Sequence, residues 1–263
     1  MYQILFRTDT IIVYSSYVMM ALAAMGAVAL IDREARWTGA DLMKVYPMLF
    51  VLYFSALFGG HGLRCLFGSS NPDPLCLLAF WKGDMTFYGG FFLAGAAFVV
   101  YARAKRMGVL ATADLLVPGV ALFLALYRVG CFLNGCCWGK VTDLPWAVTF
   151  PMHEGARHPT QLYESLNALV LLGLVTWLRR RKRFEGQFAV IFLACYPAAR
   201  FLIELFRDDP RRFVQVCGLR LSEAQAAGIP VLLCSMLLYL VGRKRSGRST
   251  CTRGPGGRHP LAG

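Results

Sequence analysis

Long apolar runs limit what this chain can fold into more than any other feature of its sequence. An α-helix needs roughly 20 apolar residues to cross a bilayer, and irregular backbone in lipid would leave its amide groups unpaired. The runs are therefore expected to be helices, and the sequence predicts an all-α polytopic membrane protein of about seven transmembrane helices. The runs cover residues 11–31, 45–67, 86–102, 109–127, 161–178, 187–206 and 225–242.

The composition fits the same class. Of the 263 residues, 57% are hydrophobic and 16% are charged, whereas a soluble domain is about half apolar and about a quarter charged. The first run is longer than the roughly 7–15 residues of a signal-peptide core, so it is expected to be a retained helix. The third run is short, and a Gly- and Cys-rich segment follows the fourth directly, which leaves open that one of them is broken or re-entrant.

Basic residues gather after each odd-numbered run. Because Lys and Arg accumulate on the cytoplasmic side of membrane proteins, these ends are expected to be cytoplasmic, with the N-terminus outside and the C-terminus inside. The segment 243–263 is expected to be a disordered cytoplasmic tail, which leaves 1–242 as the membrane domain. The basic residues are Arg33, Arg36, Lys44, Arg103, Lys105, Arg106, residues 179–183, Arg243, Lys244, Arg245, Arg248, Arg253 and Arg258.

The net charge of +13 has the same origin. Anionic lipid and the cytoplasmic bias for Lys and Arg both recruit basic residues to membrane proteins. A nucleic-acid-binding protein would instead carry a basic patch interleaved with aromatic residues on a soluble domain, and the sequence contains no such patch. Nucleic acid is therefore not an expected partner.

Ionisable groups at membrane depth are costly and are candidates for function. Near the outer end of the sixth run, Arg200, Glu204 and Arg207 have the i, i+4, i+7 spacing of one helix face. An ion pair between Arg200 and Glu204 would leave one arginine over, and phosphate is a natural partner for a guanidinium group. Arg128 closes the fourth run, where it either snorkels to the interface or meets a ligand beside the Gly-rich segment that follows.

The segment 158–164, with the sequence HPTQLYE, opens the fifth run. A proline is well tolerated at the first position of a helix. Gln161 and Glu164 lie three residues apart and would share a helix face inside the membrane boundary. A helix cap explains part of the motif but does not explain a buried Glu164, so architecture and chemistry both remain open for this residue.

Other unusual residues have more ordinary explanations. Gly89 and Gly90 at the start of the third run suit tight helix packing. Tyr14 at the outer end of the first run suits an aromatic belt. His61 lies within the apolar second run and needs a partner, for which a structural hydrogen bond is the favoured explanation.

Three clustered cysteines, Cys131, Cys136 and Cys137, raise the question of a zinc site. Their spacing lacks a second paired half, and His153 and His158 lie in poorly matched positions. No metal or other cofactor is expected. A disulfide outside the membrane is favoured over a metal.

Taken together, these residues resemble the prolipoprotein diacylglyceryl transferase family of bacterial inner-membrane enzymes. The combination of the segments 128–139, 158–164 and 200–207 is specific, whereas each one alone is weak. The matching blocks run in order across nearly the whole chain: the Tyr14 region, residues 58–60, 88–90, 128–139, 145–148, 150–151, 157–164 and 200–207.

The resemblance implies a seven-helix fold whose outward loops form a small periplasmic head. It also implies transfer of a diacylglyceryl group from phosphatidylglycerol to the lipobox cysteine thiol of a preprolipoprotein, with release of glycerol phosphate. The expected partners are phosphatidylglycerol, preprolipoprotein signal peptides and the bilayer. The family's essential arginines correspond to Arg128 and Arg200, its helix-six acid to Glu204 and its N-terminal tyrosine to Tyr14.

Two groups of site residues follow from the motifs and the resemblance. The expected catalytic residues are Arg128, Arg200, Tyr88 and Glu204, with the two arginines binding the phosphate and Glu204 fixing Arg200. The expected substrate-binding residues are Tyr14, His61, Gly89, Gly90, Asn134, Gly139, His158, Gln161, Glu164 and Arg207.

Some positions depart from the family pattern and indicate a divergent, cysteine-containing branch. The general base is consequently left open among Tyr88, His61 and His158. A catalytically silent lipid-binding or transport homologue, or a transferase with a different acceptor, remains the alternative. The departures are Tyr88 in place of a histidine, Cys131 in place of an asparagine, Cys136 in place of an acid and His61 in place of an arginine.

Overall fold

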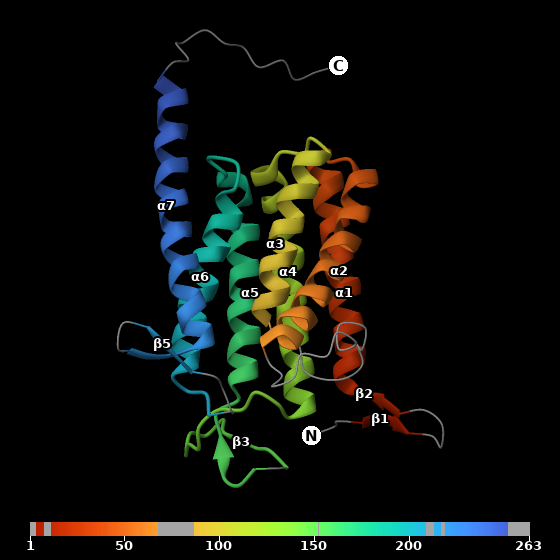
Figure 1. The fold of residues 1–263 in the computed structure, drawn as a ribbon, viewed down its shortest axis with the longest axis vertical. Coiled ribbons are helices and arrows are strands. Elements are labelled where there is room, and N and C mark those ends of the chain that lie inside the picture. The colour runs from red at the N-terminus through yellow and green to blue at the C-terminus, as the bar shows by residue number, and fades with distance from the viewer. Residues whose placement is uncertain are drawn as a thin grey trace. The chain divides into compact units, whose positions relative to one another are not determined.

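The computed structural model of the protein describes residues 4–7, 12–67, 87–151, 153–208, 213–216 and 219–251. Seven α-helices dominate these ranges (Figure 1). They are α1 (Ser15–Thr38), α2 (Leu42–Phe67), α3 (Phe87–Ala104), α4 (Val109–Asn134), α5 (Thr160–Leu178), α6 (Gln187–Glu204) and α7 (Glu223–Cys251).

In the same described ranges, the strands form three small antiparallel pairs. They are β1 (Ile4–Arg7) with β2 (Ile12–Tyr14), β3 (Val148–Thr149) with β4 (Ala156–Arg157), and β5 (Phe213–Val216) with β6 (Leu219–Ser222). The first pair precedes α1, the second lies between α4 and α5, and the third lies between α6 and α7.

The all-α polytopic membrane class is confirmed. Within the described part of the chain, five helices are long and apolar enough to cross a membrane, namely α1, α2, α4, α5 and α6. The apolar parts of α3 (Gly89–Ala104) and α7 (Gly228–Leu240) are shorter. The count of seven crossings therefore stays a prediction.

Several expected boundaries differ from the structure. The fourth apolar run was expected to end at residue 127, but α4 continues unbroken to Asn134, because the residues after Arg128 still adopt helical geometry. Helix α7 is helical through Cys251, and the expected division between a membrane domain and a disordered tail at residue 243 stays a prediction. Residues 252–263 and the expected outward loop 68–85 lie outside the described residues.

The chain forms two compact units, one of residues 32–112 and one of residues 1–31 with 113–263. In the first unit, α2 and α3 meet through glycines. A Cβ atom on Gly59 would overlap the carbonyl oxygen of Gly89, and one on Gly90 would lie 2.7 Å from the carbonyl oxygen of Ala56. The packing role expected of this glycine pair is confirmed at Gly90, because a larger residue there would force the two backbones apart, and the Gly89 backbone lies against Gly59.

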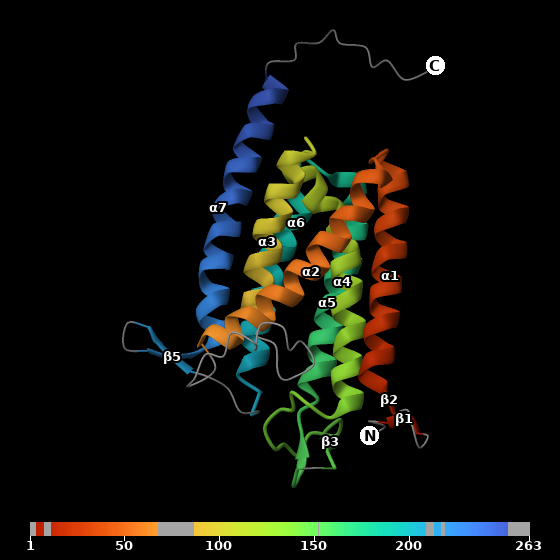
Figure 2. The same cartoon turned by 45° about the vertical axis from the view of Figure 1, so that its right-hand side comes forward.

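The core of the other unit holds α4, α5 and α6 together. Val117 and Ala121 of α4 meet Leu171 and Val175 of α5, and aromatic side chains of α6 complete the cluster. Figure 2 shows α4 beside α5, and α7 packs against α6 in turn (Figure 1). It begins with a capping box, in which the Ser222 and Gln225 side chains each bond the other's backbone N–H.

A buried carboxylate ties the start of α6 to α4. Asp114 of α4 accepts hydrogen bonds from the N–H groups of Gly186 at 2.8 Å, Phe188 at 2.8 Å and Ala189 at 2.9 Å. Lys182 adds an ion pair at 2.9 Å. The first N–H groups of a helix have no partner within it, and a negative charge is favourable there. Asp114 therefore fixes the register of α6 against α4.

We expect Asp114→Ala to lower the free energy of unfolding by about 2 kcal/mol, because it leaves several buried donors without an acceptor. Thermal unfolding of the purified protein in detergent would measure the loss. The matched control is Asp143→Ala, at an exposed loop carboxylate, which should leave the midpoint unchanged. Equal midpoints for the two variants would show that Asp114 does not anchor α6.

Candidate active site

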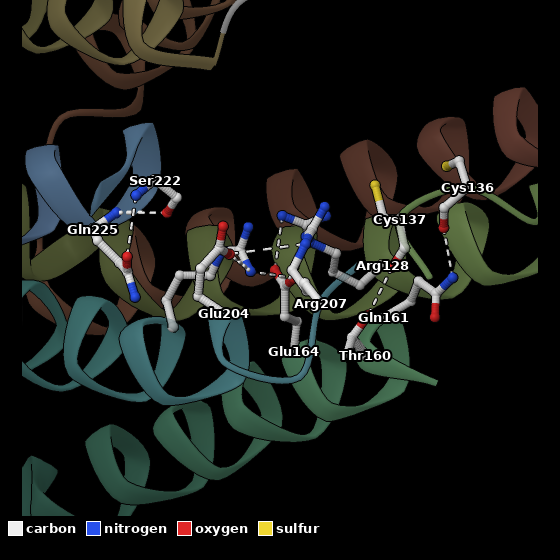
Figure 3. Close-up of polar contacts among 11 residues, drawn as sticks. Arg128, Cys136, Cys137, Thr160, Gln161, Glu164, Glu204, Arg207, Ser222 and Gln225 are labelled. Carbon is white, nitrogen blue, oxygen red and sulfur yellow. Dashed lines mark hydrogen bonds and ion pairs between the residues drawn. The ribbon is translucent and has the colours of Figure 1, made fainter. Parts of the chain in front are cut away.

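Charged residues from three helices meet in the unit that contains α4, α5 and α6. Arg128 comes from the last turns of α4, Glu164 from the first turns of α5, and Arg200 and Glu204 from the last turns of α6. Arg207 follows α6 by three residues. Figure 3 shows the side chains of Arg128, Glu164 and Arg207 directed toward one another.

Glu164 is the centre of this ion-pair cluster. Its Oε2 lies 2.8 Å from Nη2 of Arg128, and its Oε1 lies 3.0 Å from Nη1 of both Arg200 and Arg207. The side chain is only 1% exposed. A buried charge is tolerated when it is paired and hydrogen-bonded. The sequence left the role of Glu164 open, and the structure shows that it pairs with three guanidinium groups.

Glu204 holds two of the same arginines. Its Oε2 lies 2.9 Å from Nη1 of Arg200 and 3.8 Å from Nε of Arg207. Among the described residues, the cluster therefore contains three positive and two negative charges, which leaves one net positive charge. The expected ion pair between Arg200 and Glu204 is confirmed, together with the surplus of arginine.

Two buried polar atoms beside the ion pairs have no hydrogen-bond partner among the described residues: Nε of Arg128 and Oε1 of Gln161. Buried polar groups are nearly always satisfied by protein, water or ligand. A guanidinium group carries five N–H donors, more than the cluster's carboxylates use. Surplus charge and unused donors together suit an anionic ligand such as a phosphate ester.

The placement of Arg207 differs from the sequence prediction. It was expected on the same helix face as Arg200 and Glu204, but α6 ends at Glu204. Arg207 instead forms an isolated β-bridge with Gly139. Its guanidinium still reaches Glu164, because the chain turns back toward the segment that follows α4.

A tight turn after α4 is held against the start of α5. Gly135 and Cys137 both have positive φ angles, of 76° and 64°. The Thr160 hydroxyl donates to the Cys137 carbonyl oxygen at 2.7 Å, and the Gln161 amide donates to the Cys136 carbonyl oxygen. The Thr-Gln pair of the 158–164 motif therefore clamps this turn.

Gly139 lies at the closest approach of three backbone segments. Its N–H donates to the His158 carbonyl oxygen at 3.0 Å. An added Cβ would lie 2.6 Å from the Cβ of His158 and 2.7 Å from the Phe206 carbonyl oxygen. Glycine is therefore required here by space, and the residue shapes the site without contributing a side chain.

His158 is held within a group of aromatic residues. Its Nδ1 lies 3.1 Å from the Tyr163 hydroxyl, which also accepts a hydrogen bond from Trp146 Nε1 at 2.8 Å. Its ring packs against Phe206 with a centroid distance of 5.1 Å. One nitrogen of this candidate base is thus already occupied by a neighbouring side chain.

The remaining predicted site residues are placed elsewhere or not described. Tyr14 ends β2, and its ring packs edge-on against Tyr17 at 5.8 Å. His61 is 1% exposed in the other unit, where its Nε2 lies 3.7 Å from Sγ of Cys65. The Tyr88 side chain lies outside the described residues.

Asn134 is the last residue of α4, directly before the turn that contains Cys136. A residue that the sequence reasoning missed is Tyr196, one turn before Arg200 on α6. It interacts electrostatically with Arg128, so side chains from two helices of the cluster act on each other. The signal available in the sequence was its spacing, because Tyr196, Arg200 and Glu204 are four residues apart and share a helix face.

The three clustered cysteines are free thiols, so the disulfide favoured over a metal is not formed. Hydrogen bonds with the Cys131 and Cys136 thiols lower the pKa of the Cys137 thiol, and the guanidinium groups of Arg207 and Arg128 lower it further against the effect of burial. Within the described ranges, no group of three His, Cys, Asp or Glu side chains is arranged to hold a metal ion.

The fold and the site define a class: a polytopic α-helical membrane protein with a buried arginine–carboxylate cluster suited to an anionic headgroup. The chain belongs to the prolipoprotein diacylglyceryl transferase family, whose characteristic sequence pattern matches residues 3–241. The resemblance seen in the motifs is thereby confirmed.

Curated relatives agree with this assignment. A protein of Bordetella parapertussis is 39% identical over 209 residues, which cover 77% of this chain and 79% of the relative. One of Bordetella avium is 33% identical over 242 residues, covering 88% and 91%. One of Paracidovorax citrulli is 36% identical over 220 residues, covering 81% and 80%. All three are named phosphatidylglycerol–prolipoprotein diacylglyceryl transferase.

Replacing the central carboxylate should weaken the whole cluster. We expect Glu164→Gln to lower the free energy of unfolding by about 3 kcal/mol, because it leaves buried arginine charges without their common partner. Chemical or thermal unfolding in detergent would measure this loss. The exposed Glu154→Gln serves as the control, and a Glu164→Gln protein as stable as this control would contradict the central role.

Alanine substitutions at two glycines test the close approach of the backbone at Gly139. We expect Gly139→Ala to cost about 2 kcal/mol, because the methyl group meets backbone on two sides. Gly173→Ala in α5 meets nothing within 4 Å, and a better helix former should leave stability unchanged or raise it by up to about 1 kcal/mol. Thermal midpoints of both variants give the comparison, and no difference between them would rule out the close approach at Gly139.

Proposed function

We propose that this protein transfers a diacylglyceryl group from phosphatidylglycerol to the lipobox cysteine thiol of a preprolipoprotein, with release of glycerol phosphate. The observation that carries the proposal is the ion-pair cluster around Glu164, with its net positive charge and unused donors. The names of the curated relatives give the substrates of those proteins. The cluster supplies the positive charge and the N–H donors that would bind the phosphate of such a lipid.

The reaction is a displacement at the glyceryl carbon that bears the phosphate ester. The acceptor thiol loses its proton to a base, because thiolate is the nucleophile. A carbon–sulfur bond forms as the carbon–oxygen bond to phosphate breaks, and glycerol phosphate leaves with the bonding electrons. Negative charge on the phosphate grows during this step, so fixed positive charges beside it lower the barrier.

The arginines take distinct parts in this mechanism. Arg128 and Arg200 bind the phosphate and stabilise the charge that develops on it. Glu204, 2.9 Å from Arg200, fixes the orientation of that guanidinium, and Glu164 sets the spacing between the two arginines. Arg207 guides the anionic headgroup toward them.

The membrane arrangement is proposed in the same terms. Basic residues after α1, α3, α5 and α7 support a multi-pass protein of a bacterial inner membrane with a periplasmic N-terminus and a cytoplasmic C-terminus. The ion-pair cluster lies at the ends of its helices opposite to these basic residues in the sequence, so it would face the outer leaflet. Seven crossings, preprolipoprotein signal peptides as partners and no role for nucleic acid complete the proposal.

Removing either phosphate-binding arginine tests the mechanism. We expect Arg128→Ala and Arg200→Ala to lower transfer of labelled diacylglycerol from phosphatidylglycerol by about 100-fold or more, because each removes a preorganised charge. Arg181→Ala, at an exposed arginine that stacks over Trp177, is the control and should keep its activity. Membrane insertion is checked by fractionation. Normal turnover of phosphatidylglycerol in either variant would contradict the phosphate-binding role.

Complementation distinguishes the proposal from its alternatives. In a strain lacking its own transferase, this protein should restore lipid labelling of lipoproteins. Turnover of phosphatidylglycerol without lipoprotein labelling would indicate a different acceptor. Neither labelling nor turnover would indicate a lipid-binding homologue without activity, which the replacements at Tyr88 and Cys131 would then explain.

A further inference from the structure

A polar side chain in the first half of α5 has an amide nitrogen that bonds nothing nearby. Asn167 follows Glu164 by three residues, and its Nδ2 atom is buried without a hydrogen-bond partner among the described residues. Polar groups inside a membrane-spanning helix are costly unless they are bonded, and they often mark sites of function. The mechanism proposed above gives this residue no role.

Other polar side chains of the same helix are bonded. The Ser165 hydroxyl donates to the Ala125 carbonyl oxygen of α4 at 2.9 Å. The Thr176 hydroxyl donates to the Leu172 carbonyl oxygen within α5, also at 2.9 Å. Such bonds, to a neighbouring helix or to the same helix, are the usual use of polar side chains in membrane helices. The Nδ2 donor of Asn167 has no such use within the described protein.

Asn167 lies between the ion-pair cluster and the apolar core of its unit. Three residues of helix span about 4.5 Å, so Asn167 is nearly one turn further along α5 than Glu164. Leu171, one turn further again, belongs to the core that α5 shares with α4 and α6. Because residues at i+3 and i+4 spacing share a helix face, Glu164, Asn167 and Leu171 follow one another along one face of α5.

The adjoining face of α5 is apolar and exposed, as expected of a surface that contacts lipid. Leu166 and Val170 are 61% and 59% exposed. Asn167 itself is partly exposed, so it lies at the border between the packed face and this apolar face. Its terminal amide rotates about a broad torsion, so Nδ2 can turn from its buried position toward a lipid that lies along the apolar face.

An ester carbonyl oxygen is the group of phosphatidylglycerol that suits this donor. A phosphate at Arg128 and Arg200 places the ester groups only a short way further along the helices, because the glycerol backbone that joins them is short. An ester carbonyl accepts hydrogen bonds, and the Asn167 amide nitrogen donates them. The phosphate is already supplied by guanidinium donors, whose charged hydrogen bonds are stronger.

We propose that Asn167 binds the diacylglyceryl part of the lipid by donating a hydrogen bond from Nδ2 to an ester carbonyl oxygen. The proposal rests on the proposed function and deepens it, because the position of the ester follows from the phosphate at the arginines. The bond holds the glyceryl carbon that is attacked between two fixed points, the phosphate and the ester. It also makes the site selective for ester-linked over ether-linked lipids, since an ether has no carbonyl oxygen.

Phosphatidylglycerol with ether-linked chains tests the bond, because it keeps the headgroup and lacks the ester carbonyl groups. Purified full-length protein in detergent is given either lipid together with a synthetic lipobox peptide. We expect the unaltered protein to show a kcat/KM about five- to tenfold higher with the ester-linked lipid, the effect of one hydrogen bond. Asn167→Leu should lose this preference, with a lower kcat/KM for the ester-linked lipid and an unchanged one for the ether-linked lipid.

Two control variants separate this bond from general effects. Thr176→Val removes a hydroxyl that bonds within α5 and should keep the ester preference. Arg128→Ala should lose activity with both lipids alike, because both carry the phosphate. Equal use of the two lipids by the unaltered protein, or an equal loss with both lipids in Asn167→Leu, would overturn the proposal.

Stability and lipid binding complete the test. Asn167→Leu should unfold at the same temperature as the unaltered protein or at a higher one, because it removes an unpaired donor. A lower midpoint would show that the amide is bonded within the protein and would refute its role toward lipid. Failure of the unaltered protein to transfer either lipid would refute the proposed function instead, and the ester preference would then be measured as retention of the two lipids by the purified protein.

Discussion

A single buried carboxylate determines the arrangement of this site. Glu164 contacts Arg128, Arg200 and Arg207, which come from α4, from α6 and from the segment beyond α6. Three guanidinium groups would repel one another in a buried region, and their common partner removes most of that cost. Because the cluster still contains more positive than negative charge, it is stabilised in the absence of ligand and yet able to bind an anion. The proposed phosphate binding depends on this balance.

The rest of the unit keeps those charges in register from both ends of α4. At one end the Asp114 carboxylate accepts hydrogen bonds from backbone N–H groups at the N-terminus of α6. At the other end the first residues of α5 clamp the turn after α4, and Gly139 admits the backbone that leads to Arg207. Between them, the shared core of α4, α5 and α6 prevents sliding of one helix along another. Electrostatic stabilisation of a transition state requires such fixed groups, since charges that must move lose much of their effect.

The sequence predicted the parts of this arrangement that local pattern controls. Apolar runs identified the helices, and the i, i+4 spacing identified the pair of Arg200 and Glu204. The central position of Glu164 and the link from Tyr196 to Arg128 were not predictable, because they depend on contacts between residues far apart in the chain. The prediction for Arg207 was wrong for a different reason. The i+7 spacing assumes that the helix continues beyond Glu204, but α6 ends there. The positions of Tyr14, His61, Gly89 and Gly90 in the apolar runs drew attention to them, and their expected substrate-binding role came from the family resemblance. Tyr14 and His61 have local contacts, with Tyr17 and Cys65.

The cysteines change the chemistry around an otherwise retained arginine site. An acid after the Asn-Gly pair, as in the family pattern, would carry a permanent negative charge, whereas the thiols at Cys136 and Cys137 can gain or lose theirs. Arg128 and Arg207 act electrostatically on Cys137. The positive charge of the cluster is therefore felt in the turn after α4 as well as at the proposed phosphate site.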